Sequence, residues 1–401
     1  MASTAETIVV NNRLMFKKNC LIIARFGGMF LNVKQFCNKA ISIFKAEIVF
    51  TISLFTALIT SMISPPKLNY INFKVLILMF NLMIVISAFK RVKLLDKIAV
   101  EILTKHKSLR LVSLILTFVC FISSMLITND VALITFVPLT MIIAKKAKFN
   151  PIKTVIFETL AVNIGSSLTP MGNPQNLYLF SFFNIGILAF FKLTIFFVVI
   201  GALWLFMLNR RIPNINLEFD LDKIKIKDKK SVIIYCSLFI FILLSVFNVV
   251  DYRIAFIISV LVSFIIEKKL FKEVDYFLLL TFVCFFVAIG NLSNMTIIDN
   301  FMKRILINNT NVYFSSIFFS QLISNLPCAI LLSKFTNSWK VLLIGVNIGG
   351  MGTIIASLAS LISYKFYAKE YDGKKYLIKF TIYNFISLIV FAALFYIFLI
   401  V

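Results

Sequence analysis

Charged residues are scarce in this chain, and so are the side chains from which most catalytic and metal sites are built. Only 14% of the 401 residues are charged, against about 25% in soluble domains. Histidine occurs once, at position 106, and the six cysteines include no CxxC pair. A nucleophile with its base, or a metal cluster, needs several such groups close together. We therefore expect neither an enzyme nor a resident metal or other cofactor.

Apolar residues dominate the composition of the chain. They make up 60% of the chain, 45 of them are phenylalanine, and the mean hydropathy is +0.97. Lipid cannot satisfy free backbone groups, so a chain of this kind is expected to be an all-α polytopic membrane protein. We predict nine spans: 46–63, 73–89, 154–180, 187–207, 231–250, 254–266, 276–290, 341–362 and 380–400. Two further apolar pairs, 109–145 and 312–334, are predicted to be re-entrant hairpins.

The positions of the basic residues orient these spans. Of the 41 Lys and Arg, 33 fall in segments that this topology places inside and six in segments outside. Cytoplasmic loops carry the excess of positive charge, so we expect a multi-pass protein of the plasma (inner) membrane with a cytoplasmic N-terminus. Residues 1–44 are predicted to be a basic cytoplasmic leader. The lysines are scattered over short loops, which argues against a nucleic-acid partner.

The two halves of the chain repeat each other. Residues 72–96 match 275–299 at a constant offset of 203, and Thr128-Asn129 match Ser324-Asn325 at 196. The charge count gives matched spans opposite directions, so we predict inverted repeats. The expected parts are a first membrane repeat at 45–209, a cytoplasmic loop and connecting helix at 210–250, and a second repeat at 251–401.

Each repeat contains a polar hairpin tip and a Gly/Pro-punctuated break in a span. The sequence Val-Asn-Ile-Gly occurs at 162–165 and again at 346–349, and each copy opens a break, in spans 154–180 and 341–362. Irregular backbone at membrane depth survives where it is buried in protein or lines a cavity. Paired breaks in two halves predict a transporter site near the bilayer midplane.

Uncharged hydrogen-bonding side chains and flexible backbone dominate these four segments, which predicts a site for a small anion and its coupling ion. The expected substrate-binding residues are Thr128, Asn129, Asp130, Thr169, Pro170, Asn173, Ser324, Asn325, Thr353 and Ser357. The expected ion-binding residues are Asn129, Asp130, Asn163, Gly165, Asn325, Asn347 and Gly349.

Two acids remain inside the apolar segments, Asp130 and Glu158. A carboxylate at membrane depth is costly and marks a functional site by default. Both are candidates for coupling transport to an ion. A structural partner of a buried polar group is an equal alternative for Glu158. The coupling ion is Na⁺ or H⁺, and the sequence leaves both open.

Four stretches carry a resemblance to a known superfamily: SSMLITNDVALITFVPL, NIGSSLTPMGNPQNLYL, ISNLPCAILL and VNIGGMGTIIASLASLISY. Over about 45–400 the chain resembles the ion transporter superfamily, and within it the citrate-transporter-like permeases, which are related to divalent-anion:sodium symporters and arsenite permeases. The resemblance implies a scaffold domain, a mobile transport domain, a homodimer and elevator-type movement. The third tip position departs from the Ser-Asn-Thr of dicarboxylate symporters, being Asp130 in one tip and Leu326 in the other.

These observations predict a secondary active transporter, or permease, for a small anion or weak acid. Citrate, a dicarboxylate or an oxyanion would enter by symport with sodium or protons. Two alternatives stay open. One is a sodium/proton antiporter, and the other is an arsenite-type permease, which the Asn129-Asp130 tip resembles. In both, Asp130 would be the coupling carboxylate.

Overall fold

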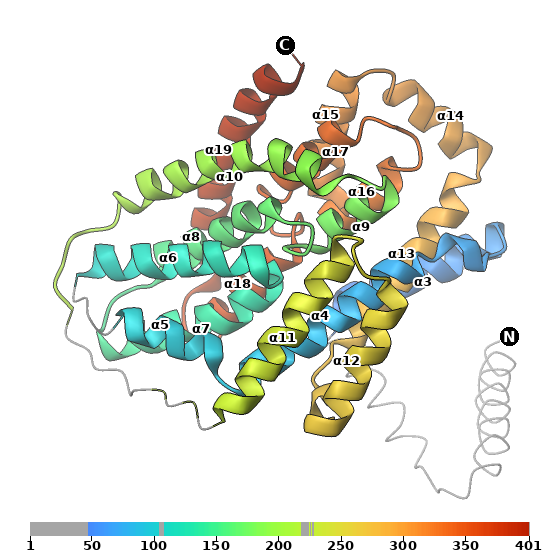
Figure 1. The fold of residues 1–401 in the computed structure, drawn as a ribbon. Helices are drawn as coiled ribbons and strands as arrows, with labels where there is room; N and C mark the ends of the chain where they lie inside the picture. Colours follow the sequence, from blue (N-terminus) through green and yellow to red (C-terminus); the bar gives the residue numbers. More distant parts are fainter. Residues whose placement is uncertain (1–46, 104–107, 218–223, 225, 227, 401) are drawn as a thin grey trace, which may run out of the picture.

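The computed structural model describes residues 47–400 except 104–107, 218–223, 225 and 227. The leader predicted at 1–44 lies outside these residues. The described part of the chain contains seventeen α-helices and three short 3-10 helices and no β-strand (Figure 1). The predicted all-helical class is therefore confirmed.

The helices of the second half follow the same order as those of the first. The first half contains α3 (Ile48–Ile63), α4 (Phe73–Arg91), α5 (Leu94–Leu103), α6 (Leu109–Leu126), α7 (Asn129–Lys146), α8 (Ile152–Gly165), α9 (Pro174–Phe182) and α10 (Ile187–Asn209). After α11 (Lys229–Val246), the second half contains α12 (Tyr252–Ile266), α13 (Tyr276–Ser293), α14 (Thr296–Ile305), α15 (Asn309–Ile323), α16 (Asn325–Leu332), α17 (Trp339–Gly349), α18 (Leu358–Ala368) and α19 (Gly373–Ile400). Helix α11 thus connects two series of eight helices.

Equivalent residues start equivalent helices. The Asn72 side chain caps α4 by accepting the Val75 N–H at 3.2 Å, and Asp275 caps α13 by accepting the Leu278 N–H at 2.9 Å. Such caps satisfy one of the free donors at a helix N-terminus. The offset of 203 found in the sequence is therefore also an offset between helix starts. The opposite direction of the two halves in the membrane stays a prediction.

Six helices are long and apolar enough to cross a membrane: α4, α6, α10, α11, α13 and α19. The two predicted broken spans do not reach that length, because α8 stops at Gly165 and α17 at Gly349. Helix α6 was predicted as one arm of a hairpin, and its 18 residues are also long enough to span. Helix α19 begins at Gly373, earlier than the predicted 380, because the Asp372 carboxylate accepts the N–H groups of Lys374 and Lys375.

The helices form two groups. Helices α3, α4, α11, α12 and α13 pack on one another, with α3 against α13 and α12 against α4. The hairpins and broken helices form the other group, in which α6 packs on α8 and α15 on α17. In Figure 1 the first group occupies the lower right.

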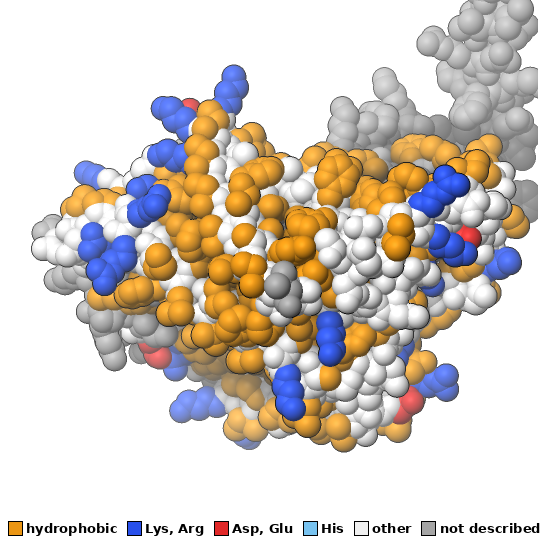
Figure 2. All heavy atoms as spheres, turned by 90° about the horizontal axis from the view of Figure 1, so that it is seen from above, with side chains coloured by type: hydrophobic (Ala, Val, Ile, Leu, Met, Phe, Trp, Pro, Cys, Tyr) orange, Lys and Arg blue, Asp and Glu red, His pale blue; other side chains and the backbone are white. Residues whose placement is uncertain are grey.

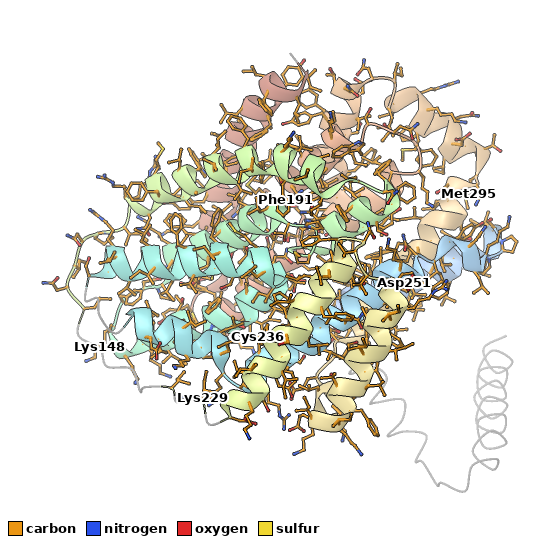
Figure 3. The ribbon with its side chains drawn as sticks, in the orientation of Figure 1. Lys148, Phe191, Lys229, Cys236, Asp251 and Met295 are labelled. Atoms are coloured by element: carbon orange, nitrogen blue, oxygen red, sulfur yellow. The ribbon has the colours of Figure 1, made fainter. Side chains whose placement is uncertain are left out.

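The labelled residues of Figure 3 show where the ends of several helices lie. Lys148 and Lys229, from segments predicted inside, lie toward the lower left, whereas Asp251 and Met295, from segments predicted outside, lie on the right. Much of the face in Figure 2 is apolar. Exposed apolar side chains are unfavourable in water and favourable in lipid, so this surface fits a membrane.

Candidate functional site

Both breaks lie at the centre of the hairpin group, and polar side chains tie them together. Asn163 lies in the last turn of α8 and accepts a hydrogen bond from the Ser357 hydroxyl before α18, at 3.0 Å. Asn347 lies in the last turn of α17 and accepts one from the Asn173 amide before α9, at 3.1 Å. All four residues are buried. Because Asn163 matches Asn347 and Asn173 matches Ser357 at the same offset of 184, the two contacts are reciprocal.

Reciprocal contacts are what a two-fold relation between the halves would produce. Asn163 also donates to the Gly350 carbonyl at 3.4 Å, and Asn347 donates to the Asn176 side chain at 2.8 Å. Asn176 in turn donates to three carbonyls of the first break, those of Ser166, Ser167 and Thr169. The free carbonyls of the broken helix are thus satisfied by amides rather than by water, as a buried break requires.

Each hairpin tip docks on the break of its own repeat through the same bond. The Asn129 N–H donates to the Gly172 carbonyl at 2.9 Å, and the Asn325 N–H donates to the Ala356 carbonyl at 2.9 Å. The acceptors are related by the same offset of 184 as the asparagines of the breaks. The structure therefore brings the predicted tips and breaks into one site.

A threonine in each break also bonds to the hairpin of its own repeat. The Thr169 hydroxyl donates to the Met125 carbonyl at 2.6 Å, and the Thr353 hydroxyl donates to the Gln321 carbonyl at 3.1 Å. Both threonines were predicted to bind substrate. In this structure their hydroxyl hydrogens hold the hairpin arms, which leaves the oxygen lone pairs for other partners. Pro170 is buried in the first break.

The second tip contains a residue with a strained backbone. Ser324 has φ of +75°, a conformation that is costly for a residue with a side chain and persists where the surroundings enforce it. Its hydroxyl donates to the Ala356 carbonyl at 3.3 Å. Thr128, the equivalent residue of the first tip, has an ordinary φ of −65° and lines a cleft.

The glycines predicted to bind an ion lie where helices touch. A Cβ on Gly165 would fall 2.3 Å from the Phe121 carbonyl oxygen, and one on Gly349 would fall 2.5 Å from the Ser320 Cβ. Small residues let backbones approach in this way. The Gly349 carbonyl accepts the Gln321 amide at 2.7 Å. Both glycines therefore have a packing role, and ion binding by them stays a prediction.

Asp130 is the charged group of the site. It is 9% exposed, its backbone N–H donates to the Asn129 side chain at 2.9 Å, and its Oδ1 is buried without a hydrogen-bond partner among the described residues. It lines a cleft of about 380 Å³ between the two helix groups. A buried polar atom without a partner marks a site for something that is absent, such as an ion or a proton.

Sequence reasoning missed the charges on the opposite wall of this cleft. Lys90, at the end of α4, and Asp275, before α13, line that wall, and Lys365 of α18 lines the cleft on the side of Asp130. Lys90 and Lys365 were counted as ordinary loop charges on the inside. No local pattern marks them, because the packing of α4, α13 and α18 around the tip decides that they line the cleft of Asp130.

Glu158 lies apart from this centre. Its side chain is fully buried, Oε1 accepts the Thr140 hydroxyl at 2.5 Å, and Oε2 has no hydrogen-bond partner in the described part of the chain. Thr140 is ten residues beyond Asp130 on α7, which corresponds to roughly 15 Å of helix. If Glu158 has a coupling role, it would bind the ion or proton at a second place, separate from Asp130. That place lies on the side of the site that was predicted to face the cytoplasm.

Gln321 is a second residue that the sequence did not indicate. Its amide donates to the carbonyls of Gly349 and Met351 at 2.7 and 3.0 Å, and its oxygen accepts the Thr353 N–H at 2.9 Å. It therefore holds the second break as Asn176 holds the first. Its position in an apolar helix arm, two residues before the end of α15, was the available signal, since a glutamine there needs partners.

We expect Gln321→Leu to loosen the second break. The substitution removes the three side-chain hydrogen bonds to the second break and a fourth to the Ile317 carbonyl of its own helix, and the loss of the bonds to the break should cost about 1–3 kcal/mol. The check is the melting temperature of the purified protein, with Gln321→Glu as the conservative variant that keeps the acceptor for Thr353. Equal melting temperatures for wild type and Gln321→Leu would contradict this role.

Apolar helices, two docked hairpin tips and two crossed breaks define a multi-pass membrane transporter. Residues 40–338 match the citrate transporter (CitMHS) family. The chain is 38% identical over 313 residues, 77% of its length, to "Uncharacterized transporter MJ0456" of Methanocaldococcus jannaschii, of which the match covers 85%. The chain therefore belongs to the CitMHS citrate transporter family, within the ion transporter superfamily, and its family indicates a transporter and not an enzyme.

Two further comparisons give another relative and a similar fold. The chain is 25% identical over 300 residues, 74% of its length, to "Inner membrane protein YbiR" of Escherichia coli, of which 80% is covered. Its fold is similar to that of the Alcanivorax borkumensis YdaH transporter, whose crystal structure has an unusual topology. The TM-score is 0.52 at 15% identity, with 80% of this chain and 83% of that chain covered.

Proposed function

We propose that the chain is a secondary active transporter of a small anion or weak acid, of the citrate, dicarboxylate or oxyanion kind. Transport would be coupled to sodium or protons and proceed by elevator-type alternating access, with the N-terminus in the cytoplasm. The observation that carries the proposal is the docking of both hairpin tips on two reciprocally linked breaks. The family's description as citrate transporters supports the anion class.

Four half-helices begin at this centre. Helix α7 begins at Asn129, beside the residues that precede α9, and α16 begins at Asn325, beside those that precede α18. A helix N-terminus carries free N–H groups and a partial positive charge, which favours an anion. This arrangement would let the site bind an anion without an arginine.

The separation of the helices into two groups supports elevator movement. The cleft that reaches Asp130 is lined on one side by α4 and α13 and on the other by α7 and α18. If the hairpin group slides as one body, the cleft closes and the tips become accessible from the other side. We expect the other group to be the scaffold and to form a homodimer.

A second candidate function is cation/proton antiport or arsenite-type permeation through Asp130. The specific observation in its favour is the unpartnered Oδ1 beside an otherwise uncharged tip. The two functions predict different ligands for the protein. A melting temperature raised by an anion only when sodium is present supports the anion symporter, because a ligand of the folded state stabilises it by mass action. An increase from sodium alone, whatever the anion, supports antiport.

Transport in proteoliposomes tests the site directly. We expect Asn129→Ala and Asn325→Ala each to lower uptake of the bound anion by at least about tenfold, because each variant keeps the backbone bond that docks its tip but loses the side-chain amide that is proposed to bind the anion and its coupling ion. Asn337→Ala, in an exposed loop, is the matched control and should transport at the wild-type rate. Wild-type uptake by both tip variants would overturn the assignment of the site.

A further inference from the structure

A second pocket lies far from the tips, between the start of α6 and the end of α10. Its volume is about 340 Å³. Arg110, Asn209 and Arg210 form its polar side, and Leu111, Leu114 and Phe206 form its apolar side. Both helices are long enough to cross a membrane, and these ends belong to segments with inside charges. The pocket is therefore expected at the cytoplasmic surface of the bilayer.

Both arginines of this pocket have guanidinium N–H donors that are available to a ligand. The Arg110 guanidinium donates through Nε to the Ile212 carbonyl at 2.8 Å, which fixes it and leaves its four other N–H donors. The Arg210 guanidinium lies over the Phe206 ring, 5.4 Å from its centroid. Within the described residues neither arginine forms an ion pair with an acid, and no acid lines the pocket. Two fixed guanidinium groups without counter-ions form a site for a phosphate group.

A buried asparagine gives a second and independent indication of a ligand. Asn209 is 2% exposed, and its amide donates to the Arg110 carbonyl at 2.9 Å. The same side chain leaves Oδ1 buried without a hydrogen-bond partner among the described residues. An ionised phosphate has no hydrogen to donate to the Asn209 Oδ1, whereas the hydroxyl of a glycerol group can donate to it.

We infer that this pocket binds the headgroup of an anionic phospholipid of the phosphatidylglycerol kind. The arginines would hold the phosphate, and Asn209 would accept a headgroup hydroxyl. The acyl chains would follow Leu111 and Phe206, which are 37% and 44% exposed toward the membrane. Basic pockets between spanning helices on the cytoplasmic side commonly bind such headgroups. A bound lipid would connect the loop after α10 to α6, which packs on the first break.

The test uses the purified full-length protein after delipidation. Melting temperatures are measured while phosphatidylglycerol, phosphatidylcholine or inorganic phosphate is added. We expect stabilisation by phosphatidylglycerol alone, with a concentration for half effect that rises about fivefold in Arg210→Gln. Arg210→Lys should keep most of the effect, because it keeps the charge. Arg253→Gln, at the opposite end of the molecule, is the control and should respond as wild type does.

Arg210 is the better residue to change, because Arg110 also holds the loop after α10. Three results would overturn the proposal. Equal stabilisation by phosphatidylcholine would mean that any lipid suffices. Stabilisation by inorganic phosphate to the same extent would identify a phosphate site rather than a lipid site. An unchanged response of Arg210→Gln to phosphatidylglycerol would place the lipid elsewhere. Transport activity does not enter the readout, so the result stands independently of the proposed function.

Discussion

Asp130→Asn is expected to abolish ion-driven accumulation of the transported anion. The substitution keeps the size and the hydrogen-bonding shape of the side chain, so the tip should dock on the break as before. It removes the charge that a cation or proton would neutralise at the buried Oδ1. A coupling energy of ordinary size corresponds to a loss on the order of 100-fold in the accumulation ratio. The measurement is accumulation in proteoliposomes with an imposed sodium or pH gradient.

The variant also distinguishes coupling from binding. If Asp130 exchanges a proton, wild-type accumulation rises as the external medium becomes more acidic, and Asp130→Asn loses this dependence while anion exchange without a gradient persists. Asp299→Asn is the matched control, since its carboxylate pairs with Lys303 on the surface of α14 and exposed pairs of this kind contribute little. Gradient-driven accumulation at the wild-type level by Asp130→Asn would remove Asp130 from the coupling mechanism.

Gly165→Val should have the largest effect on folding. The Cβ alone would overlap the Phe121 carbonyl, and that backbone atom cannot move unless α6 and α8 separate. Overpacking of a close helix contact costs about 3 kcal/mol, which is a large part of a typical net stability. We therefore expect little folded protein after purification. Gly349→Val should behave similarly, since its Cβ would meet Ser320 in the equivalent contact.

Gly186→Ala is the control for these glycines. Nothing lies within 4 Å of the added Cβ at that position, so the variant should elute and melt as the wild type does. The measurements are the size-exclusion profile and the melting temperature in detergent. A melting temperature of Gly165→Val within a degree of wild type would show that α6 and α8 do not pack as closely as described.

Local patterns in the sequence predicted much of the fold. Asn72 and Asp275 cap helices because a side-chain acceptor near a helix start needs only neighbours along the chain. The breaks after Gly165 and Gly349 follow from Gly and Pro in a few consecutive positions. The equivalent offsets of the two halves predicted which tip belongs with which break, and both tips dock there.

Local patterns did not predict which residues of distant segments contact one another. Gln321 contacts the second break from the arm of a hairpin, and Lys90 reaches the cleft of Asp130 from another helix group. Nothing in the residues around them indicates a partner, because a helix of apolar residues presents similar side chains to lipid and to protein. The packing role of Gly165 could not be predicted for the same reason, since the neighbour that forbids a side chain is on α6.

The sequence by itself determined the class of protein and the positions of the breaks and hairpin tips, because hydropathy and helix-breaking residues act over short stretches of chain. Only the tertiary structure decided how these parts meet. It linked Asn163 to Ser357 and Asn347 to Asn173, left one oxygen of Asp130 without a partner, and opened its cleft toward Lys90. Those outcomes depend on how helices far apart in sequence pack together, and packing is set by the shapes of all side chains at once.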